Sequence, residues 1–370
     1  MALLELSNGP TLAFDDLSLR FASLYLQRIL PEEKRPRILL GATSGDMGAS
    51  AAHHFANVPG VDLVLVSPKD RMSKCQARIL YNETAPNVHH LVGEGTFDDC
   101  QDLVNRVLAD EAFCAEHRIG AINSTLWIRI VSHLVYYFWS YLQAVDRVGE
   151  EVVYAVPAGN FGNAYAGWLA KRMGLPIMRL IVATNENDTF DRFVRTGVYR
   201  PRPSSETILT SSPSMDVSRA ANVERFLYSF LKCDSRRVRE LMVLLEDTGE
   251  FSLSAEEFAR LRRSGLSSGS SDHPNRLEII EEMYLNHHVF VDPHTADALY
   301  SGIILHPVGV KTLCLETVQP VKFPRMVRAA TGHNPEWPFG YKAPPEVVTP
   351  PASHALDEEW LRGVVGEIGR

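Results

Sequence analysis

Short apolar runs alternate with helix-like stretches along most of the chain. Five runs are nearly uninterrupted by polar residues, as in strands buried on both faces: "RILLGAT", "VDLVLVSP", "EVVYAVPAG", "MRLIVATN" and "VKTLCLETV". Amphipathic segments that suit helices lie between them, at residues 48–58, 95–113, 126–145 and 163–174. This alternation predicts an α/β fold with mostly parallel sheets and helices on both faces.

Two parts of the chain depart from this pattern. Residues 198–276 are richer in helix signals, charge and serine, so we expect an insertion or an extended helical region, with one mobile loop at "RRSGLSSGSSDHP". Residues 346–370 form a proline-rich tail in which "ALDEEWLRGVV" suits a short closing helix. Because ligands of α/β folds bind at the carboxyl ends of strands, we look for function in the loops there.

Composition and charge narrow the class of protein. The formal net charge of −8, without a long basic block, disfavours nucleic acid and anionic membranes as partners. No apolar run approaches the roughly 18 residues of a membrane span, and the first residues lack the features of a secretory signal. The five cysteines include no CxxC pair, which favours a reducing compartment, with the cytoplasm as the default, and we expect no metal site.

Two loops combine small residues with the start of a helix. "GATSGDMGAS" spans Gly41–Ser50 and "VPAGNFGNAYAG" spans Val156–Gly167, each after a predicted strand. The small residues let backbone N–H groups approach an anion, and the helix dipole favours a phosphate or carboxylate. One such loop can be a simple turn, whereas two suggest a ligand with two anionic ends, or a phosphorylated cofactor beside an anionic substrate.

Charged residues near these loops have alternative interpretations. "PKDRMSK" offers Lys69, Arg71 and Lys74 either as anion partners or as a solvated helix start. Arg129 lies among apolar residues and must find a carboxylate, a phosphate or water, because a buried unpaired charge is prohibitive. Asp15 and Asp16 precede the apolar spacing of a helix, which predicts an N-cap pair.

Nine motifs occur in order between about residues 4 and 330, and they are "LELSNGPTLAFDDLSL", "GATSGDMGASAA", "GTFDDCQDLV", "INSTLWIRIVSHLVYYF", "VPAGNFGN", "MGLPIMRLIVATNENDTFDRF", "SPSMDVSRAANVERFL", "VDPHTA" and "TVQPVKF". Together they resemble threonine synthase, most of all the fungal type. The resemblance implies the two-domain architecture of the β-family (fold type II) of pyridoxal-phosphate (PLP) enzymes. It also implies conversion of O-phosphohomoserine and water to threonine and phosphate. We expect a larger domain from residues 1–30 and 146–345, a smaller α/β domain from residues 31–145, and the tail 346–370.

The resemblance further implies roles for individual residues. The cofactor phosphate is expected at Gly159, Asn160, Phe161, Gly162 and Asn163. The pyridine nitrogen of the cofactor is expected to face Thr317. The substrate is expected at the loop of Thr43, Ser44, Gly45 and Asp46, with Lys69, Ser73 and Arg129 as partners for its anionic groups.

The sequence also departs from the family pattern. "LAFKD" has become "LAFDD", so Asp15 replaces the lysine that forms the Schiff base with PLP. Met47 replaces a threonine, Ile128 replaces the alanine of "WARI", and Ala158 replaces the usual threonine or serine. The chain also begins almost on "LELSNGPT", without the family's long N-terminal segment. A carboxylate can transfer protons but cannot tether the cofactor, and acid–base catalysis alone contributes about 10²- to 10⁴-fold.

Three functions therefore remain open. The first is a threonine synthase-like pseudoenzyme that binds PLP non-covalently, or has lost it, and regulates or scaffolds a partner. The second is an altered enzyme of amino-acid or secondary metabolism that uses PLP or its amine form with Asp15 as base or counter-ion. The third is a working threonine synthase with Lys69, Lys74 or Lys322 as a substitute lysine. In each case we expect a small, anionic, amino-acid-like ligand and a monomer or homodimer.

Overall fold

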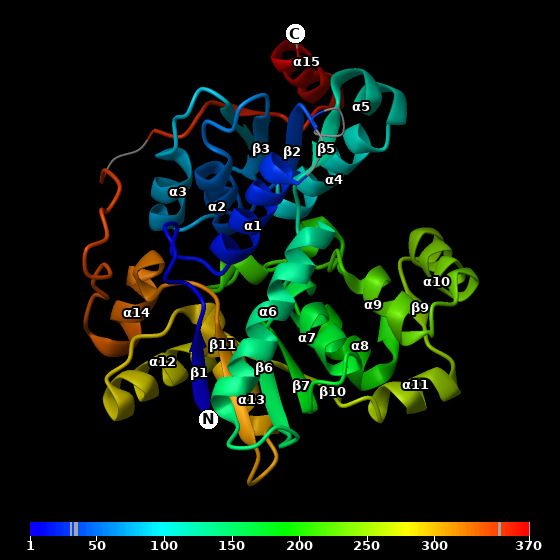
Figure 1. The fold of residues 1–370 in the computed structure, drawn as a ribbon, viewed down its shortest axis with the longest axis vertical. Coiled ribbons are helices and arrows are strands. Elements are labelled where there is room, and N and C mark those ends of the chain that lie inside the picture. The colour runs from blue at the N-terminus through cyan, green and yellow to red at the C-terminus, as the bar shows by residue number, and fades with distance from the viewer. Residues whose placement is uncertain (30–31, 33–35, 347–348, 370) are drawn as a thin grey trace.

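Two parallel sheets form the framework of the molecule (Figure 1). The structure is a computed structural model that describes residues 1–29, 32, 36–346 and 349–369. The larger sheet has the order β1 (Ala2–Glu5), β11 (Lys311–Glu316), β6 (Val152–Pro157), β7 (Ile177–Thr184) and β10 (Leu266–Ser270). The smaller sheet has the order β12 (Ser353–His354), β4 (Val88–Gly93), β3 (Asp62–Pro68), β2 (Ile38–Ala42) and β5 (Ile119–Ala121). A short antiparallel pair joins β8 (Val198–Tyr199) to β9 (Phe251–Ser252).

Helices connect the strands and cover both sheets. They are α1 (Asp15–Arg28), α2 (Asp46–Phe55), α3 (Lys74–Tyr81), α4 (Phe97–Leu108), α5 (Glu111–His117), α6 (Trp127–Ala144), α7 (Gly162–Arg172), α8 (Thr189–Thr196), α9 (Val223–Phe230), α10 (Ser235–Thr248), α11 (Ala255–Arg262), α12 (His273–His287), α13 (Pro293–Leu305), α14 (Pro324–Thr331) and α15 (Glu358–Ile368). Short 3-10 helices are η2 (Ser204–Glu206), η3 (Pro213–Met215) and η4 (Pro320–Lys322). None of the helices described here is long and apolar enough to cross a membrane.

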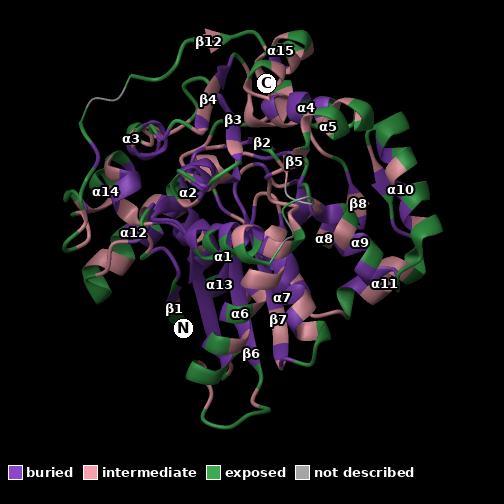
Figure 2. Cartoon of the chain, turned by 45° about the horizontal axis from the view of Figure 1, so that its top comes forward, coloured by how far each residue is buried: buried purple, intermediate pink, exposed green. Residues whose placement is uncertain are grey.

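Each sheet is buried on both faces, as the uninterrupted apolar runs predict. In β6, Val152, Tyr154 and Val156 pack with α6 and α7, whereas the alternating Val153 and Ala155 pack with α13. The smaller sheet is enclosed in the same way by α1, α2 and α3 on one face and by α4 and α15 on the other. Figure 2 shows this arrangement as buried strands inside a shell of helices with exposed outer faces. The predicted α/β class and all five predicted strands are confirmed.

The segment 198–276 differs from its prediction at one end. It contains the expected helices α9, α10 and α11, but the predicted mobile loop contains β10, which pairs in parallel with β7. Serines of β10 replace the usual apolar residues because their hydroxyls have partners: Ser268 Oγ donates to Asp191 Oδ1 over 2.7 Å, and Ser270 Oγ donates to Asn185 O over 2.8 Å. The prediction of a loop here is therefore wrong.

The packing also differs from the predicted division into domains. Helix α1 packs on the smaller sheet through Leu19 and Leu26, and α6 packs on the larger sheet through Ile130 and Tyr137, so the two helices exchange sides relative to the prediction. The tail 346–370 adds β12 and α15 to the smaller sheet. The predicted boundary at residues 30–31, together with residues 347–348 and 370 of the tail, lies outside the described residues.

Candidate active site

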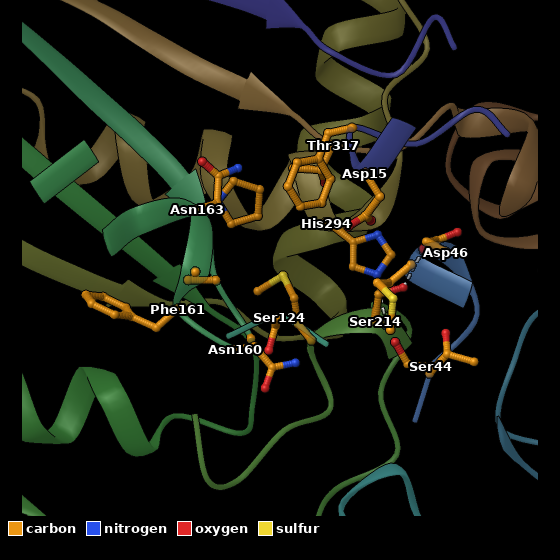
Figure 3. Close-up of a pocket in the computed structure, with 18 of the residues that line it drawn as sticks. Asp15, Ser44, Asp46, Ser124, Asn160, Phe161, Asn163, Ser214, His294 and Thr317 are labelled. Atoms are coloured by element: carbon orange, nitrogen blue, oxygen red, sulfur yellow. Dashed lines mark hydrogen bonds between the residues drawn. The ribbon is translucent and has the colours of Figure 1, made fainter. Parts of the chain in front are cut away.

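A cavity lies where the carboxyl ends of both sheets meet (Figure 3). Its wall combines the start of α1, the β2–α2 and β6–α7 loops, one face of α6 and the residues after β11. Figure 3 shows the β6–α7 loop on one side and Asp15, Asp46 and His294 on the other. The cavity therefore lies where parallel α/β folds bind their ligands, at the carboxyl ends of the strands.

The β6–α7 loop has the geometry of an anion cradle. From Gly159 to Ala164, no backbone N–H group donates to any of the described residues, and these groups surround the start of the eleven-residue helix α7. Phe161 adopts a left-handed conformation with a φ of 61°. This costs on the order of 1 kcal/mol, which burial of its ring against Phe190 and Phe226 offsets.

Two glycines allow the backbone of this loop to approach its surroundings. A Cβ atom at Gly159 would lie 3.2 Å from the Met215 Cα atom, and one at Gly162 would lie 3.2 Å from the Asn222 Nδ2 atom. Asn222 is fully buried and donates from Nδ2 to Asn160 O over 2.9 Å, which holds the loop in place. A larger side chain at Gly162 would therefore disturb the cradle itself.

Asn163 adds a side-chain donor to the cradle. Its Oδ1 atom accepts hydrogen bonds from the hydroxyls of Tyr136 over 2.6 Å and Tyr137 over 3.0 Å. Its Nδ2 atom is buried without a partner among the described residues, and Asn163 lines the cavity. An amide fixed in this way is prepared to donate to an acceptor in the cavity.

Asp15 and Arg129 form a buried ion pair in the wall of the cavity. The Arg129 guanidinium donates to Asp15 Oδ1, and it also donates to Ser18 Oγ over 3.1 Å and Asn123 O over 3.3 Å. Both charged side chains are about 95% buried, with exposed fractions of 5% and 4%. Burial raises the pKa of Asp15 to about 6, against the opposing effect of Arg129.

The predicted N-cap pair is wrong for both aspartates. Phe14 occupies the N-cap position of α1 and makes no side-chain cap, and Asp15 is the first helical residue. Asp16 turns back to accept hydrogen bonds from the N–H and hydroxyl of Thr11, over 2.8 and 2.7 Å, and from Ser50 Oγ over 2.8 Å. Asp16 thus stabilises the turn before the helix, and Asp15 belongs to the cavity.

Asp46 links the two sheets beside the cavity. Its Oδ1 atom accepts from the fully buried Lys322 Nζ over 2.8 Å, and its Oδ2 atom accepts from Ser214 Oγ over 2.7 Å and Gln76 Nε2 over 2.8 Å. Burial disfavours the charge, but Lys322, together with His294 and the Ser214 hydroxyl, lowers the pKa of Asp46. Both carboxylate oxygens therefore already have protein partners.

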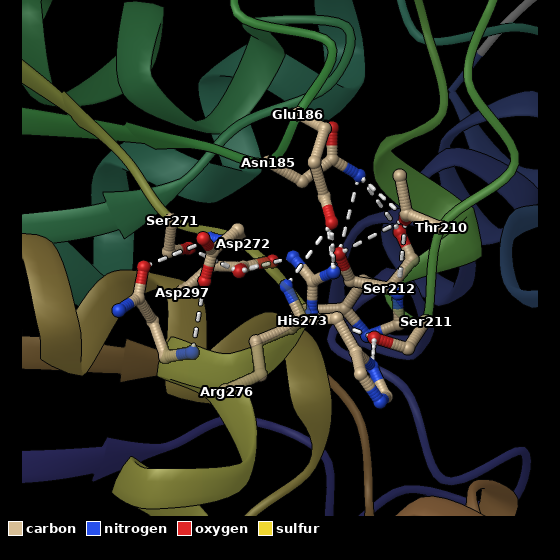
Figure 4. Close-up of polar contacts among 12 residues, drawn as sticks. Asn185, Glu186, Thr210, Ser211, Ser212, Ser271, Asp272, His273, Arg276 and Asp297 are labelled. Carbon is tan, nitrogen blue, oxygen red and sulfur yellow. Dashed lines mark hydrogen bonds and ion pairs between the residues drawn. The ribbon is translucent and has the colours of Figure 1, made fainter.

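The segment that brings Ser214 and Met215 to the cavity is anchored by a polar cluster (Figure 4). Arg276 is fully buried and donates to Ser211 Oγ over 2.8 Å, to Asp297 Oδ1 over 3.0 Å and to both carboxylate oxygens of Glu186. The backbone N–H of Ser214 donates to His294 Nε2 over 3.1 Å. Because that nitrogen accepts, His294 carries its proton on Nδ1, which donates to Asp292 over 2.7 Å.

Most of the residues predicted for the site line the cavity. They are Asp15, Thr43, Ser44, Asp46, Arg129, Gly159, Asn160, Phe161, Gly162, Asn163 and Thr317. Three predicted residues do not line it: Gly45, Lys69 and Ser73. Lys69 is half-exposed and lies 3.5 Å from Glu94, and the Ser73 hydroxyl caps α3 and donates to Lys322 O over 2.7 Å.

The structure adds cavity residues to which sequence reasoning assigned no role. They are Phe14, Phe97, Gln101, Ser124, His133, Ser214, Met215 and His294. Ser214 and His294 stand within the motifs "SPSMD" and "VDPHTA", which offered a signal. His133 also stands within a motif, "INSTLWIRIVSHLVYYF", but its place in an apolar helical stretch pointed to packing and not to the cavity. Among the described residues, no cluster of side chains could hold a metal ion.

Comparisons with known proteins define the class. The profile of the family described as "Pyridoxal-phosphate dependent enzyme" matches residues 2–253. The threonine synthase of Methylobacillus glycogenes is 43% identical over 91% of this chain and 71% of its own, and that of Saccharomyces cerevisiae is 34% identical over 93% and 71%. The PLP-bound threonine synthase of Brucella melitensis superposes with a TM-score of 0.86 at 34% identity, covering 100% of this chain and 78% of its own.

The chain therefore belongs to the family of pyridoxal-phosphate dependent enzymes, and within it to the threonine synthases and their relatives. The fold type II architecture that the resemblance implied is confirmed. The bacterial relative exceeds the yeast enzyme in identity, so the resemblance is not special to the fungal type.

One end of the cavity suits the phosphate of PLP, the cofactor of this family, but the described residues of the cavity wall offer no lysine for its covalent attachment. The free N–H groups of the cradle and the unpartnered Asn163 amide suit a phosphate. Of the described residues that line the cavity, none is a lysine, and the resemblance in sequence puts Asp15 where the family has its lysine.

Proposed function

We propose that this protein is a threonine synthase-like pseudoenzyme that binds PLP, or a related phosphorylated ligand, reversibly. It does not make threonine from O-phosphohomoserine by the lysine-dependent route. The observation that carries the proposal is the buried ion pair of Asp15 and Arg129, because the resemblance in sequence puts Asp15 where the family has its lysine. Its ligand is small, anionic and amino-acid-like, and it acts in the cytoplasm.

The cradle residues would hold the phosphate through the backbone of Gly159 to Asn163. Thr317, which also lines the cavity, would face the pyridine nitrogen, as the family motif implies. When bound, PLP supplies an electrophilic aldehyde and an electron sink. Asp15 can hold a proton at its carboxylate, but it has no amine with which to attach the cofactor or release a product.

Arg129 has a different role from the predicted one in this proposal. Its guanidinium is engaged with Asp15, Ser18 and Asn123, so it neutralises Asp15 rather than receiving a substrate anion. Lys69, the other predicted cationic partner, lies outside the cavity wall. The cavity therefore retains the phosphate end of the family's site without the cations expected for a second phosphate.

The alternative of an active threonine synthase with a substitute lysine has less support. Lys322 is fully buried and bound to Asp46, Lys69 pairs with Glu94, and Lys74 is an exposed first residue of α3. None of the three lines the cavity. An altered enzyme that uses Asp15 as a base would need the carboxylate to leave Arg129 unpaired, which is costly for a buried cation.

The binding of the cofactor and the turnover of O-phosphohomoserine can be measured separately. Added PLP and pyridoxamine 5′-phosphate should raise the melting temperature, because a ligand that binds the folded state stabilises it. Gly162→Asp should abolish that rise by crowding the cradle and repelling phosphate, while Gly363→Asp, at an open position of α15, should preserve it. The wild-type protein should release no phosphate from O-phosphohomoserine at an enzymatic rate. No thermal shift with either ligand, or phosphate release at such a rate, would refute the proposal.

A further inference from the structure

His133 is a buried imidazole in the cavity wall whose Nδ1 atom has no hydrogen-bond partner among the described residues. Its exposed fraction is 3%. The ring packs on Phe14, with centroids 5.4 Å apart and planes inclined by 29°, and on Tyr136 at 5.5 Å. An unmet buried hydrogen-bonding group costs about 1–3 kcal/mol, so a partner that enters the cavity would recover that cost.

His133 lies beside the place where the family's lysine would stand. It follows Arg129 by four residues on α6, so both side chains project from the same face of the helix. Arg129 binds Asp15, and Phe14, which packs on the His133 ring, directly precedes Asp15. The imidazole and the Asp15–Arg129 pair therefore form one continuous part of the wall.

The imidazole is neutral in this environment. Burial, and secondarily the Arg129 charge, hold the pKa of His133 well below its usual value. A neutral imidazole offers one N–H donor and one acceptor, which suits a hydroxyl or carbonyl group rather than a phosphate. Phosphate has its own site at the cradle, so the two polar groups of the wall select different parts of one ligand.

A partly buried histidine, His90, shows what a purely structural imidazole looks like in this fold. His90 also has an unpartnered Nδ1 atom, but its Nε2 atom bonds to Glu83 O over 3.0 Å and its ring packs on Tyr81. His90 does not line the cavity. Of these two residues with an unpartnered Nδ1 atom, only His133 lines the cavity.

We propose that His133 is a ligand-contacting residue that hydrogen-bonds the oxygen substituent at the C4′ position of a phosphorylated pyridine ligand. The contact positions the group that a covalent lysine positions in the family. This inference rests on the proposed function, because it requires the phosphate of the same ligand to occupy the cradle. His133 has no role among those that the family resemblance implied. In this inference, it selects between ligands that share a phosphate.

Two unreactive ligands isolate this contact. Pyridoxine 5′-phosphate carries a C4′ hydroxyl, whereas 4-deoxypyridoxine 5′-phosphate lacks that oxygen and shares the ring and phosphate. By calorimetry, the wild-type protein should bind the first about tenfold more tightly, as expected for one buried hydrogen bond. His133→Phe should bind both with the affinity of the wild type for the deoxy ligand. His133→Asn, which places an amide near the position of Nδ1, should recover part of the preference.

The outcomes separate this inference from the proposed function. If the wild-type protein binds neither ligand, both this inference and the proposed function are refuted. If it binds both ligands equally, or if His133→Phe keeps the wild-type preference, phosphate binding stands and the role of His133 is refuted. His90→Phe is the matched control and should leave the preference unchanged, because His90 lies away from the cavity. The wild-type comparison needs no variant, so a variant that fails to fold cannot protect the inference.

Discussion

Asp15 shows what the identity of a residue does and does not reveal. The resemblance in sequence predicted a departure from the family at Asp15, and the apolar surroundings of Arg129 predicted that it must find a partner. It did not reveal that the two residues pair, because they are 114 positions apart and local helix preferences explained Asp15 equally well. The helix-start interpretation failed because a tertiary contact outweighed capping, which contributes about 1 kcal/mol.

A lysine at position 15, as in the family, should therefore destabilise the folded protein. Asp15→Lys leaves Arg129 buried without its carboxylate and adds a second positive charge, which should lower the free energy of unfolding by about 3–5 kcal/mol. Urea denaturation at pH 7 measures this loss. Glu94→Lys reverses the charge in the half-exposed pair with Lys69 and should cost no more than about 1 kcal/mol. Equal losses in the two variants would show that Asp15 and Arg129 are not a buried pair.

Strands differ in how well their sequences announce them. β2, β3, β6, β7 and β11 were predictable because a strand enclosed by helices must be apolar on both faces. β10 was not, because its "LSSGS" is composed of residues that also favour loops. Its serines are satisfied by Asp191 and Asn185, and no local pattern in the sequence encodes contacts with partners so far along the chain.

The junction of β1 and β11 should make stability depend on pH. Glu316, at the end of β11, accepts from the N–H groups of Leu6 and Ser7 over 3.0 and 3.2 Å and from Ser7 Oγ over 2.6 Å. Burial raises its pKa to about 7, so between about pH 4.5 and 7 the folded state binds more protons than the unfolded state. The contribution of Glu316 to stability therefore falls as pH rises through this window.

Glu316→Gln tests this dependence because an amide keeps an acceptor oxygen and does not titrate. Between pH 4.5 and 8, the unfolding free energy of the variant should rise relative to the wild type by on the order of 3 kcal/mol. Urea denaturation across that range gives both curves. Curves that stay parallel would mean that Glu316 ionises at its ordinary pKa in the folded protein.

At the scale of the whole molecule, the sequence predicted the position of the cavity but not all of its wall. Loops after strands were correct guides to the cradle and to Thr43, Ser44 and Asp46, because parallel strands bring their carboxyl ends together. The contributions of His133 and of the segment with Ser214 depend on how α6 and residues 207–216 pack. Sequence patterns do not determine that packing, just as they misassigned α1 and α6 between the sheets.

The ion pair between Asp46 and Lys322 should join the two halves of the molecule energetically. Lys322→Met leaves Asp46 buried and unpaired, which should cost about 3–5 kcal/mol, and adding Asp46→Asn should recover much of that loss. Lys311→Met removes the ammonium of an exposed pair with Asp146 and should cost no more than about 1 kcal/mol. Thermal or urea unfolding of Lys322→Met, Asp46→Asn, the double variant and Lys311→Met provides the comparison. Additive losses from Lys322→Met and Asp46→Asn would contradict a coupled pair.

The most direct test of a PLP site without its lysine is a search for the covalent link. The wild-type protein is saturated with PLP, reduced with borohydride and digested, and its lysine-containing peptides are examined by mass spectrometry, with excess pyridoxine 5′-phosphate as competitor. We predict that dialysis before reduction removes the bound PLP and that no lysine carries a stoichiometric pyridoxyl group. A stoichiometric, competitor-sensitive group on Lys69, Lys74 or Lys322 would contradict the proposed function and would identify the lysine that has taken over from the missing one.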